Sequence, residues 1–313
     1  MSHTLKVAAV GLVALAMTAC SGNSSSMPTL QHSGTQSIGH TGGSMSQAGI
    51  DLSKVHIMRT RNSQGPTSDA PQTLQYFGGP VERTPAIYIV FWGFNVSGSD
   101  PSGEQAYMTA LFNGLGGSTW LATDKQYYQT KAGVNQKIKN PTGQLKGTWV
   151  DSSSVPSSPT DAQIRAEAAS AESHFGYNKN ANYMVATPHN HNSSGFGTQY
   201  CAYHSPTASN GGEISYSNIP YMTDAGGNCG ENSVNPGSSG ILDGVSIVTG
   251  HEEAESQTDP EVGLATAWYN NNYGEIGDIC AWQGLGNITI STGKFAMQPL
   301  WSNKTSTCTL HTP

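Results

Sequence analysis

The positions of the cysteines constrain the fold of this chain more than any other feature. The chain has 313 residues and five cysteines, and four of the five lie beyond residue 200: Cys201, Cys229, Cys280 and Cys308. In an exported chain an even number of cysteines predicts disulfides, and four cysteines allow three connectivities. We favour the pairs Cys201–Cys229 and Cys280–Cys308, because closure of local loops is the simplest pairing. No C-x-x-C pair occurs, which disfavours a zinc site built from these thiols.

The N-terminus predicts export. A short cationic segment, MSHTLK, precedes the apolar run VAAVGLVALAM and the small residues TAC. The apolar run is too short for a membrane span and is typical of a signal peptide, here residues 1–20. The residues Met-Thr-Ala-Cys are also similar to a bacterial lipobox, which predicts a lipid on Cys20 that attaches the protein to a membrane; plain secretion is the alternative. We therefore expect an outer-membrane lipoprotein or a secreted or periplasmic protein.

The composition is typical of an extracellular protein rich in loops and short strands. Only 11% of the residues are charged, and the 14 Lys and Arg residues are scattered along a chain of net charge −7. Nucleic-acid binding is therefore excluded. Residues 21–75 contain few large apolar side chains and are predicted to be a Ser/Gly-rich tether and pro-like segment. Residues 76–313 are expected to form a single domain.

Apolar patterns in that domain predict an α+β fold, in which helices cover a twisted sheet. Strands are expected at 86–94 and 181–188, and helices at 102–117, 118–130 and 160–176. Ser102 is the expected cap of the first helix, and Thr160 with Gln163 is expected to form a capping box on the third. Residues 189–240 are predicted to be loops with short extended pieces.

A further helix, predicted over residues 244–257, carries the candidate site. Asp243 is expected to cap it, and Asp259-Pro260 to end it. The sequence GHEEAES places His251 and Glu255 four residues apart, so that they are neighbours on the helix surface. In the H-E-x-x-H pattern two histidines bind zinc and the glutamate between them activates a water molecule.

By analogy, the pattern H-E-x-x-E predicts His251 and Glu255 as metal ligands and Glu252 as the general base. The non-functional alternative is a helix with a charged, solvated face.

In thermolysin-like proteases the third ligand is a glutamate twenty residues after the second ligand of the motif, and Glu275 stands at that distance from Glu255. Asp278 is expected to orient His251 or to act as a ligand itself. The analogy with the zinc motif makes zinc the expected metal. Two carboxylates would largely neutralise a Zn²⁺ ion and weaken its effect on a bound water molecule, so Ca²⁺ or Mn²⁺ are alternatives.

Short motifs follow one another in order between residues 76 and 308: YFGGPV, IYIVFWG, YCAYHS, GHEEAESQTDP, AWYN, GEIGDIC and QPLWSN. Together they resemble the Exordium or phosphate-induced protein family, whose plant members are extracellular and which has exported bacterial relatives. The resemblance implies a shared site made of His251, Glu252, Glu255, Asp259, Glu275 and Asp278. The resemblance does not imply a particular reaction, because none is settled for the family. Cys201, Cys229, Cys280 and Cys308 also have counterparts in the family's pattern.

The same resemblance adds His204, in CAYHS, as a catalytic candidate. It is expected to bind the metal or to stabilise an oxyanion, and the alternative is a structural histidine that bonds a nearby carbonyl. Glu253 stands where the family usually has an apolar or aromatic residue, so this helix position is expected to be more exposed here.

The leading hypothesis is an exported, metal-dependent hydrolase with a zincin-like active-site helix. It would cleave an extracellular or periplasmic peptide by means of a metal-activated water molecule. One alternative is a non-catalytic cell-surface or glycan-binding protein with a structural metal or an acidic cluster. Another is a metal-independent hydrolase that uses Glu252 with Asp278 or Glu255.

Overall fold

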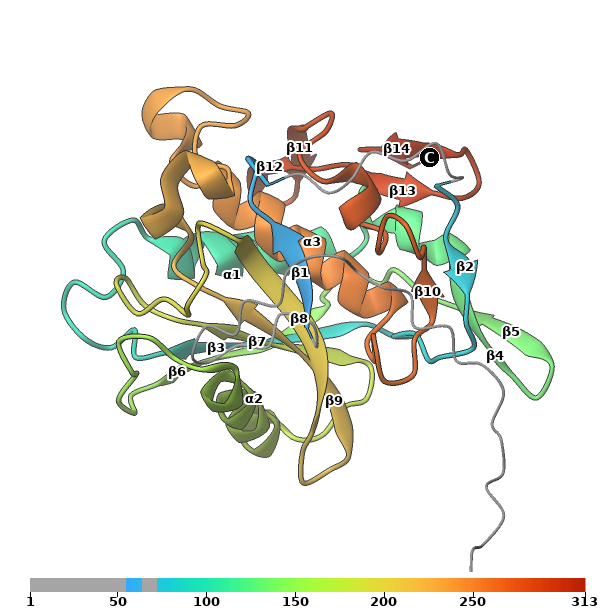
Figure 1. Ribbon diagram of the computed structural model, residues 1–313, viewed down its shortest axis with the longest axis horizontal. Coiled ribbons are helices and arrows are strands. Elements are labelled where there is room, and N and C mark those ends of the chain that lie inside the picture. The colour runs from blue at the N-terminus through green and yellow to red at the C-terminus, as the bar shows by residue number, and fades with distance from the viewer. Residues whose placement is uncertain (1–54, 64–71, 313) are drawn as a thin grey trace, which may run out of the picture. The chain divides into compact units, whose positions relative to one another are not determined.

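The computed structural model describes residues 55–63 and 72–312 (Figure 1). The predicted signal peptide, the lipidation site Cys20 and the tether up to residue 54 lie outside the described residues. Within the described ranges, no helix combines the length and apolar character that crossing a membrane requires.

A six-stranded mixed sheet forms the centre of the fold. Its strands lie in the order β1–β8–β9–β7–β3–β6, with the bounds β1 His56–Arg59, β3 Ala86–Trp92, β6 Leu145–Asp151, β7 Ala181–Ala186, β8 Tyr200–Ala208 and β9 Glu213–Ile219. The neighbours β6, β3, β7 and β9 are parallel, whereas β8 pairs antiparallel with both β9 and β1. Strands β3 and β7 are buried over almost their whole length, as is usual for parallel strands covered on both faces.

Helices cover both faces of this sheet (Figure 1). The α-helices are α1 Glu104–Leu115, α2 Asp161–Phe175 and α3 Asp243–Thr258. Successive side chains of β3 point to opposite faces of the sheet. On one face Ile87, Ile89 and Phe91 belong to a core with α1 and α3. On the other face Val90 and Trp92 pack with α2. The expected combination of a sheet with a few helices is therefore confirmed, although four of the strands are parallel neighbours.

Short elements complete the domain. The 3₁₀ turns are η1 Leu121–Gln126, η2 Met222–Cys229, η3 Gly237–Gly240 and η4 Asp278–Cys280. Two-stranded pairs join β2 Gln75–Tyr76 to β10 Trp268–Tyr269, β4 Tyr128–Lys131 to β5 Val134–Lys137, β11 Gly286–Ile290 to β12 Gly293–Met297, and β13 Leu300–Ser302 to β14 Thr307–Thr309.

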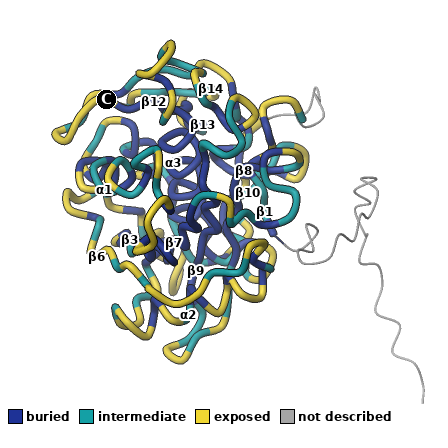
Figure 2. Tube along the Cα trace, turned by 90° about the vertical axis from the view of Figure 1, so that its left-hand side faces the viewer, coloured by how far each residue is buried: buried dark blue, intermediate teal, exposed yellow. Residues whose placement is uncertain are grey.

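Helix α3 is buried along its entire length. All 16 of its residues are buried, and Figure 2 shows the helix inside the molecule. The large sheet lies on one side, and strand β12 packs against the helix, where the Ser246 hydroxyl donates to the carbonyl of Ala296 (2.6 Å). A Cβ at Gly250 would meet the terminal methyl group of Met297, so this glycine leaves room for that buried side chain. The alternative of a solvated helix face is therefore wrong.

Two details of α3 differ from the expectations. Glu253 is fully buried rather than exposed, and its carboxylate accepts hydrogen bonds from Asn182 Nδ2 (3.2 Å) and Gln257 Nε2 (2.8 Å). The polar partner on β7 thus allows a glutamate to be buried at this position. Asp243 lies inside the first turn instead of capping it, and its carboxylate accepts the N–H groups of Val234 (2.8 Å) and Asn235 (2.7 Å).

The remaining predicted elements were correct where the local signal was strong. The capping box of Thr160 and Gln163 is present on α2, and the strand predicted at 86–94 is β3. Helix α1 begins after Gly103, not Ser102, because the carboxylate of Asp100 accepts the first free N–H groups. The helix predicted at 118–130 is wrong: only the turn η1 forms there, followed by β4.

The largest error concerns residues 189–240, where loops with short extended pieces were expected and the structure has the long inner strands β8 and β9. Strand β9 and the later part of β8 bury polar side chains, so no long apolar run marks these strands in the sequence. Ser217, for example, is fully buried and donates to Asn182 Oδ1 on β7 (3.0 Å). Polar pairing between strands replaces apolar packing there.

Both favoured disulfides are present. The Cα atoms of Cys201 and Cys229 are 5.5 Å apart, and those of Cys280 and Cys308 are 5.7 Å apart. The first bond joins β8 to η2, and the second joins η4 to β14. Paired cysteines of this kind are typical of proteins outside the reducing cytoplasm, in agreement with the expected export.

We expect the double substitution Cys280→Ser with Cys308→Ser to lower the free energy of unfolding by about 3.5 kcal/mol, the loop-closure value for a separation of 28 residues. Denaturant titration of both forms would measure it. The pair Cys201→Ser with Cys229→Ser closes a loop of the same length and is the matched comparison. An unfolding midpoint that is unchanged in both double variants would contradict the presence of these two disulfides.

Candidate metal centre

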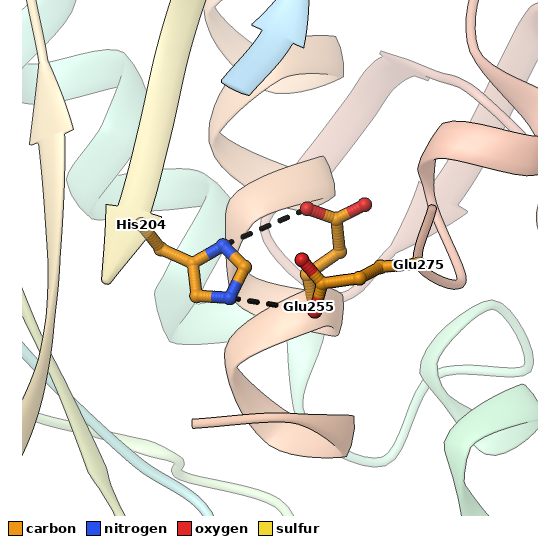
Figure 3. A group of neighbouring side chains, drawn as sticks. All are labelled: His204, Glu255 and Glu275. Atoms are coloured by element: carbon orange, nitrogen blue, oxygen red, sulfur yellow. Dashed lines mark ion pairs between the residues drawn. The ribbon is translucent and has the colours of Figure 1, made fainter. Parts of the chain in front are cut away.

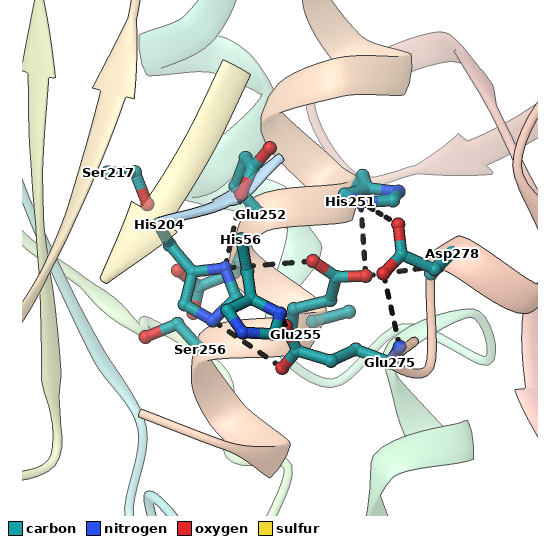
Figure 4. Close-up of polar contacts among 12 residues, drawn as sticks. His56, His204, Ser217, His251, Glu252, Glu255, Ser256, Glu275 and Asp278 are labelled. Carbon is teal, nitrogen blue, oxygen red and sulfur yellow. Dashed lines mark hydrogen bonds and ion pairs between the residues drawn. The ribbon is translucent and has the colours of Figure 1, made fainter. Parts of the chain in front are cut away.

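Acidic and histidine side chains from four segments meet beside α3 (Figure 4). Helix α3 supplies His251, Glu252 and Glu255, strand β8 supplies His204, η4 and the segment before it supply Asp278 and Glu275, and strand β1 supplies His56. Residues that are far apart in the sequence thus form one cluster.

The first group within this cluster consists of His204, Glu255 and Glu275 (Figure 3). One possible ligand atom from each lies within 4.8 Å of the others. His204 Nε2 is 3.5 Å from Glu275 Oε1, and His204 Nδ1 is 3.6 Å from Glu255 Oε2. All three side chains are buried. An imidazole and two carboxylates at these separations offer the ligand types that Zn²⁺ accepts.

The second group consists of His251, Glu255 and Asp278, again with ligand atoms within 4.8 Å of one another. His251 Nε2 is 3.0 Å from Glu255 Oε1 and 3.7 Å from Asp278 Oδ1, so one nitrogen faces both carboxylates. Two atoms that each bind one ion at about 2.1 Å lie about 3.4 Å apart at the tetrahedral angle. The observed separations bracket this value.

The three predicted ligands are therefore divided between two groups. Glu255 belongs to both, His251 to one and Glu275 to the other. The spacing of twenty residues does bring the carboxylates of Glu255 and Glu275 together. Asp278 lies with His251, and its backbone N–H donates to Glu255 Oε1 (3.0 Å). Asp259 belongs to neither group; its Oδ1 accepts the N–H of Ala267 (2.7 Å) and holds the chain that follows α3.

Several buried polar atoms of the cluster have no hydrogen-bond partner among the described residues. They are His204 Nε2, both ring nitrogens of His251, Glu252 Oε1 and both carboxylate oxygens of Glu275. His251 Nε2 and Glu255 Oε1 are only 3.0 Å apart, yet they are not in hydrogen-bond geometry. A buried polar group without a partner costs about 1–3 kcal/mol. Atoms that are close together without pointing at each other have the arrangement that a shared cation requires.

The charge balance also favours a cation. Within the described part of the chain, the ion-pair partners of Glu252, Glu255, Glu275 and Asp278 are histidines, and no Lys or Arg pairs with these carboxylates. Buried carboxylates need a compensating positive charge or must take up protons.

Without a bound ion, burial favours the uptake of protons by these carboxylates. Loss of hydration raises the pKa of Glu252, Glu255 and Asp278 to about 7, against the opposing influence of the neighbouring histidines, and raises the pKa of Glu275 well above its ordinary value. Burial lowers the pKa of His204, but the carboxylates of Glu275 and Glu252 outweigh it and raise that pKa well above its usual range. A divalent cation would displace protons from these groups.

Glu252 contacts the first group through His204. A hydrogen bond of 3.2 Å joins His204 Nδ1 to Glu252 Oε2. When Nδ1 carries the proton, the lone pair of Nε2 faces Glu275, which is the usual arrangement of a histidine ligand held by a carboxylate. The second oxygen, Glu252 Oε1, has no partner in the described chain.

Two glycines in GEIGDIC make room for the cluster. A Cβ at Gly277 would lie 2.6 Å from His251 Nδ1 and 2.9 Å from Glu255 Oε1. Gly274 has a φ of 90° in the left-handed region, and a Cβ there would collide with the carboxylate of Asp278. The motif therefore combines two acidic side chains with the two positions at which the backbone must approach them closely.

His56 was not predicted as part of the site. It lies in the segment assigned to the tether, but β1 pairs with β8 in a register that places His56 opposite His204. Its Nδ1 is 3.4 Å from Glu275 Oε2, and its ring contacts Tyr269 edge to face. A four-residue edge strand has no apolar pattern, so only the tertiary structure reveals it.

The cluster is almost enclosed. The side chains of His56 and Asp278 are 27% and 21% exposed, whereas those of His204, His251 and Glu275 are fully buried. The partly exposed side chains of the cluster are thus those of His56 on β1 and Asp278 on η4.

In comparisons of the chain with known proteins, no family model, no curated protein and no solved structure matches it. The resemblance to the Exordium family therefore stays a prediction that depends on the sequence motifs.

We expect Gly277→Ala to disturb this site, because the new methyl group would push His251 and Glu255 apart. Binding of Zn²⁺ or Mn²⁺, measured by calorimetry, should weaken at least tenfold. The matched control is Gly227→Ala, since a Cβ at Gly227 meets nothing within 4 Å and the residue has no left-handed backbone. Equal affinities in the two variants would show that the close approach at Gly277 is unimportant for ion binding.

Proposed function

We propose that this protein is a metal-dependent hydrolase whose ion binds at Glu255 on α3. The observation that carries the proposal is the convergence of unpartnered imidazole nitrogens and carboxylate oxygens around that residue. The ligand set mixes nitrogen and oxygen atoms, which suits Zn²⁺ or Mn²⁺ better than Ca²⁺, an ion that prefers oxygen alone.

A bound divalent ion would supply the acidity that turns water into a nucleophile near neutral pH. Glu252 is the proposed proton acceptor, because Oε2 is engaged with His204 while Oε1 has no partner. His204 is the proposed link between this base and the ion. A base with one oxygen fixed and one free is held in a defined orientation towards the cluster.

We propose a peptide as the substrate. This choice depends on the H-E-x-x-E helix and on Glu275 at the spacing found in thermolysin-like proteases. The disulfides support action outside the cytoplasm. An N-terminal lipid at Cys20 would keep the enzyme at a membrane surface, where exported peptides are available.

A structural ion is the second candidate, and the enclosure of the cluster favours it. The side chains of His56 and Asp278 are only partly exposed, so a substrate has little access to the cluster in this conformation. In that case the chain would be a non-catalytic cell-surface protein, and removal of the ion would lower its stability without any effect on a reaction.

The exchange Glu252→Gln separates these candidates. For the hydrolase we expect the variant to retain its metal, measured by mass spectrometry of the purified protein, and to cleave a peptide library about 10²–10⁴-fold more slowly, the usual contribution of a general base.

Glu253→Gln is the matched control, because it makes the same change one residue further along α3, at a side chain that contacts Asn182 and Gln257 instead of the cluster. Full activity in Glu252→Gln would remove Glu252 from the mechanism. Absence of both peptidase activity and metal from the wild-type protein would refute the proposed function.

A further inference from the structure

We infer that the cluster binds two divalent ions, with Glu255 as the carboxylate that bridges them. This inference rests on the proposed metal-dependent function and adds to it a second ion and a division of the ligands. One ion would lie between His204 and Glu275, and the other between His251 and Asp278.

The orientation of Glu255 is the first argument. Its two oxygens face opposite halves of the cluster: Oε1 is 3.0 Å from His251 Nε2, and Oε2 is 3.6 Å from His204 Nδ1 (Figure 4). Nδ1 of His204 is the nitrogen that bonds Glu252. However, one ligand atom each of His204, Glu255 and Glu275 lies within 4.8 Å of the others, so Glu255 can offer one oxygen to each half. Hydrolytic two-metal sites hold their ions about 3.5–4 Å apart, a distance that a single carboxylate can span.

The separation of the ligand atoms is the second argument. Each half has its own histidine and its own acidic residue, and Glu255 is the shared member. No choice of one ligand atom each from His251, Glu255 and Glu275 brings all three within 4.8 Å. Two ligands of one ion cannot be further apart than about 4.2 Å, twice a bond of about 2.1 Å. A single ion therefore cannot bind His251, Glu255 and Glu275 together unless these buried side chains move.

The charge count is the third argument. Glu252, Glu255, Glu275 and Asp278 supply four carboxylates, and their ion-pair partners in the described chain are histidines. Two divalent cations match four ionised carboxylates, whereas with a single ion the remaining carboxylates must be balanced by protonated histidines or must themselves take up protons. Uncompensated buried charge is strongly unfavourable.

The buried polar atoms that lack a hydrogen-bond partner among the described residues are also divided between the two halves of the cluster. His251 Nε2 lies in one half, and His204 Nε2 and both oxygens of Glu275 lie in the other, all buried and without a hydrogen-bond partner among the described residues. An ion in only one half would leave the atoms of the other half unsatisfied.

Manganese provides the test, because two Mn²⁺ ions bridged by a carboxylate are magnetically coupled and give an electron paramagnetic resonance spectrum unlike that of an isolated ion. We expect metal-free wild-type protein to bind two equivalents of Mn²⁺ by calorimetry and to show the coupled spectrum. Glu275→Gln and Asp278→Asn each disable one half, so each should bind one equivalent and show the six-line spectrum of an isolated ion.

Glu253→Gln is again the control and should bind two coupled ions. Circular dichroism would establish that each variant is folded, and the wild-type stoichiometry tests the inference even if a variant does not fold. One equivalent in the wild-type protein would overturn the two-ion centre and leave the proposed hydrolase intact. Two uncoupled ions would overturn the bridge by Glu255. No bound ion would overturn both proposals.

Discussion

The burial of carboxylates on α3 is the constraint on which the rest of the structure depends. A helix with four acidic side chains can lie inside a protein only if each of them finds a partner. Away from the cluster, protein groups suffice: Asp243 accepts backbone N–H groups, and Glu253 binds two amide side chains. At Glu252 and Glu255 the side-chain partners are histidines that have ring nitrogens without a hydrogen-bond partner among the described residues. The protein alone therefore leaves buried polar atoms unsatisfied there.

The covalent framework supports the segments that supply the ligands. Cys201 precedes His204 by three residues on β8 and fixes this strand to η2. Cys280 follows Asp278 by two residues and fixes η4 to β14. Each disulfide therefore fixes a segment that supplies residues to the cluster, and α3 itself is buried along its whole length. A centre held by rigid elements keeps its ligand atoms in place without the bound ion.

The sequence predicted the parts of this arrangement that depend on local signals. The extent of α3, the capping box of α2, the pairing of neighbouring cysteines and the meeting of Glu255 with Glu275 all follow from spacing or residue type. The sequence did not predict that β8 and β9 are central strands, because their buried serine and histidine side chains resemble those of loops. His56 was missed for a related reason, since its place depends on the pairing of β1 with β8, which four residues cannot encode. The division of the ligands into two groups depends on side-chain directions, which spacing does not determine.

Glu252 bears most directly on the choice between a structural and a hydrolytic ion. A purely structural site gains from using every buried oxygen as a ligand or as a hydrogen-bond acceptor. Glu252 instead uses one oxygen to orient His204 and leaves the other without a partner inside a fully buried helix. Such an oxygen costs free energy and adds nothing to stability. A hydrolase needs a free oxygen at that place, beside a histidine ligand, to accept a proton from water. The unused oxygen of Glu252 is therefore harder to explain in a structural site than in a catalytic one.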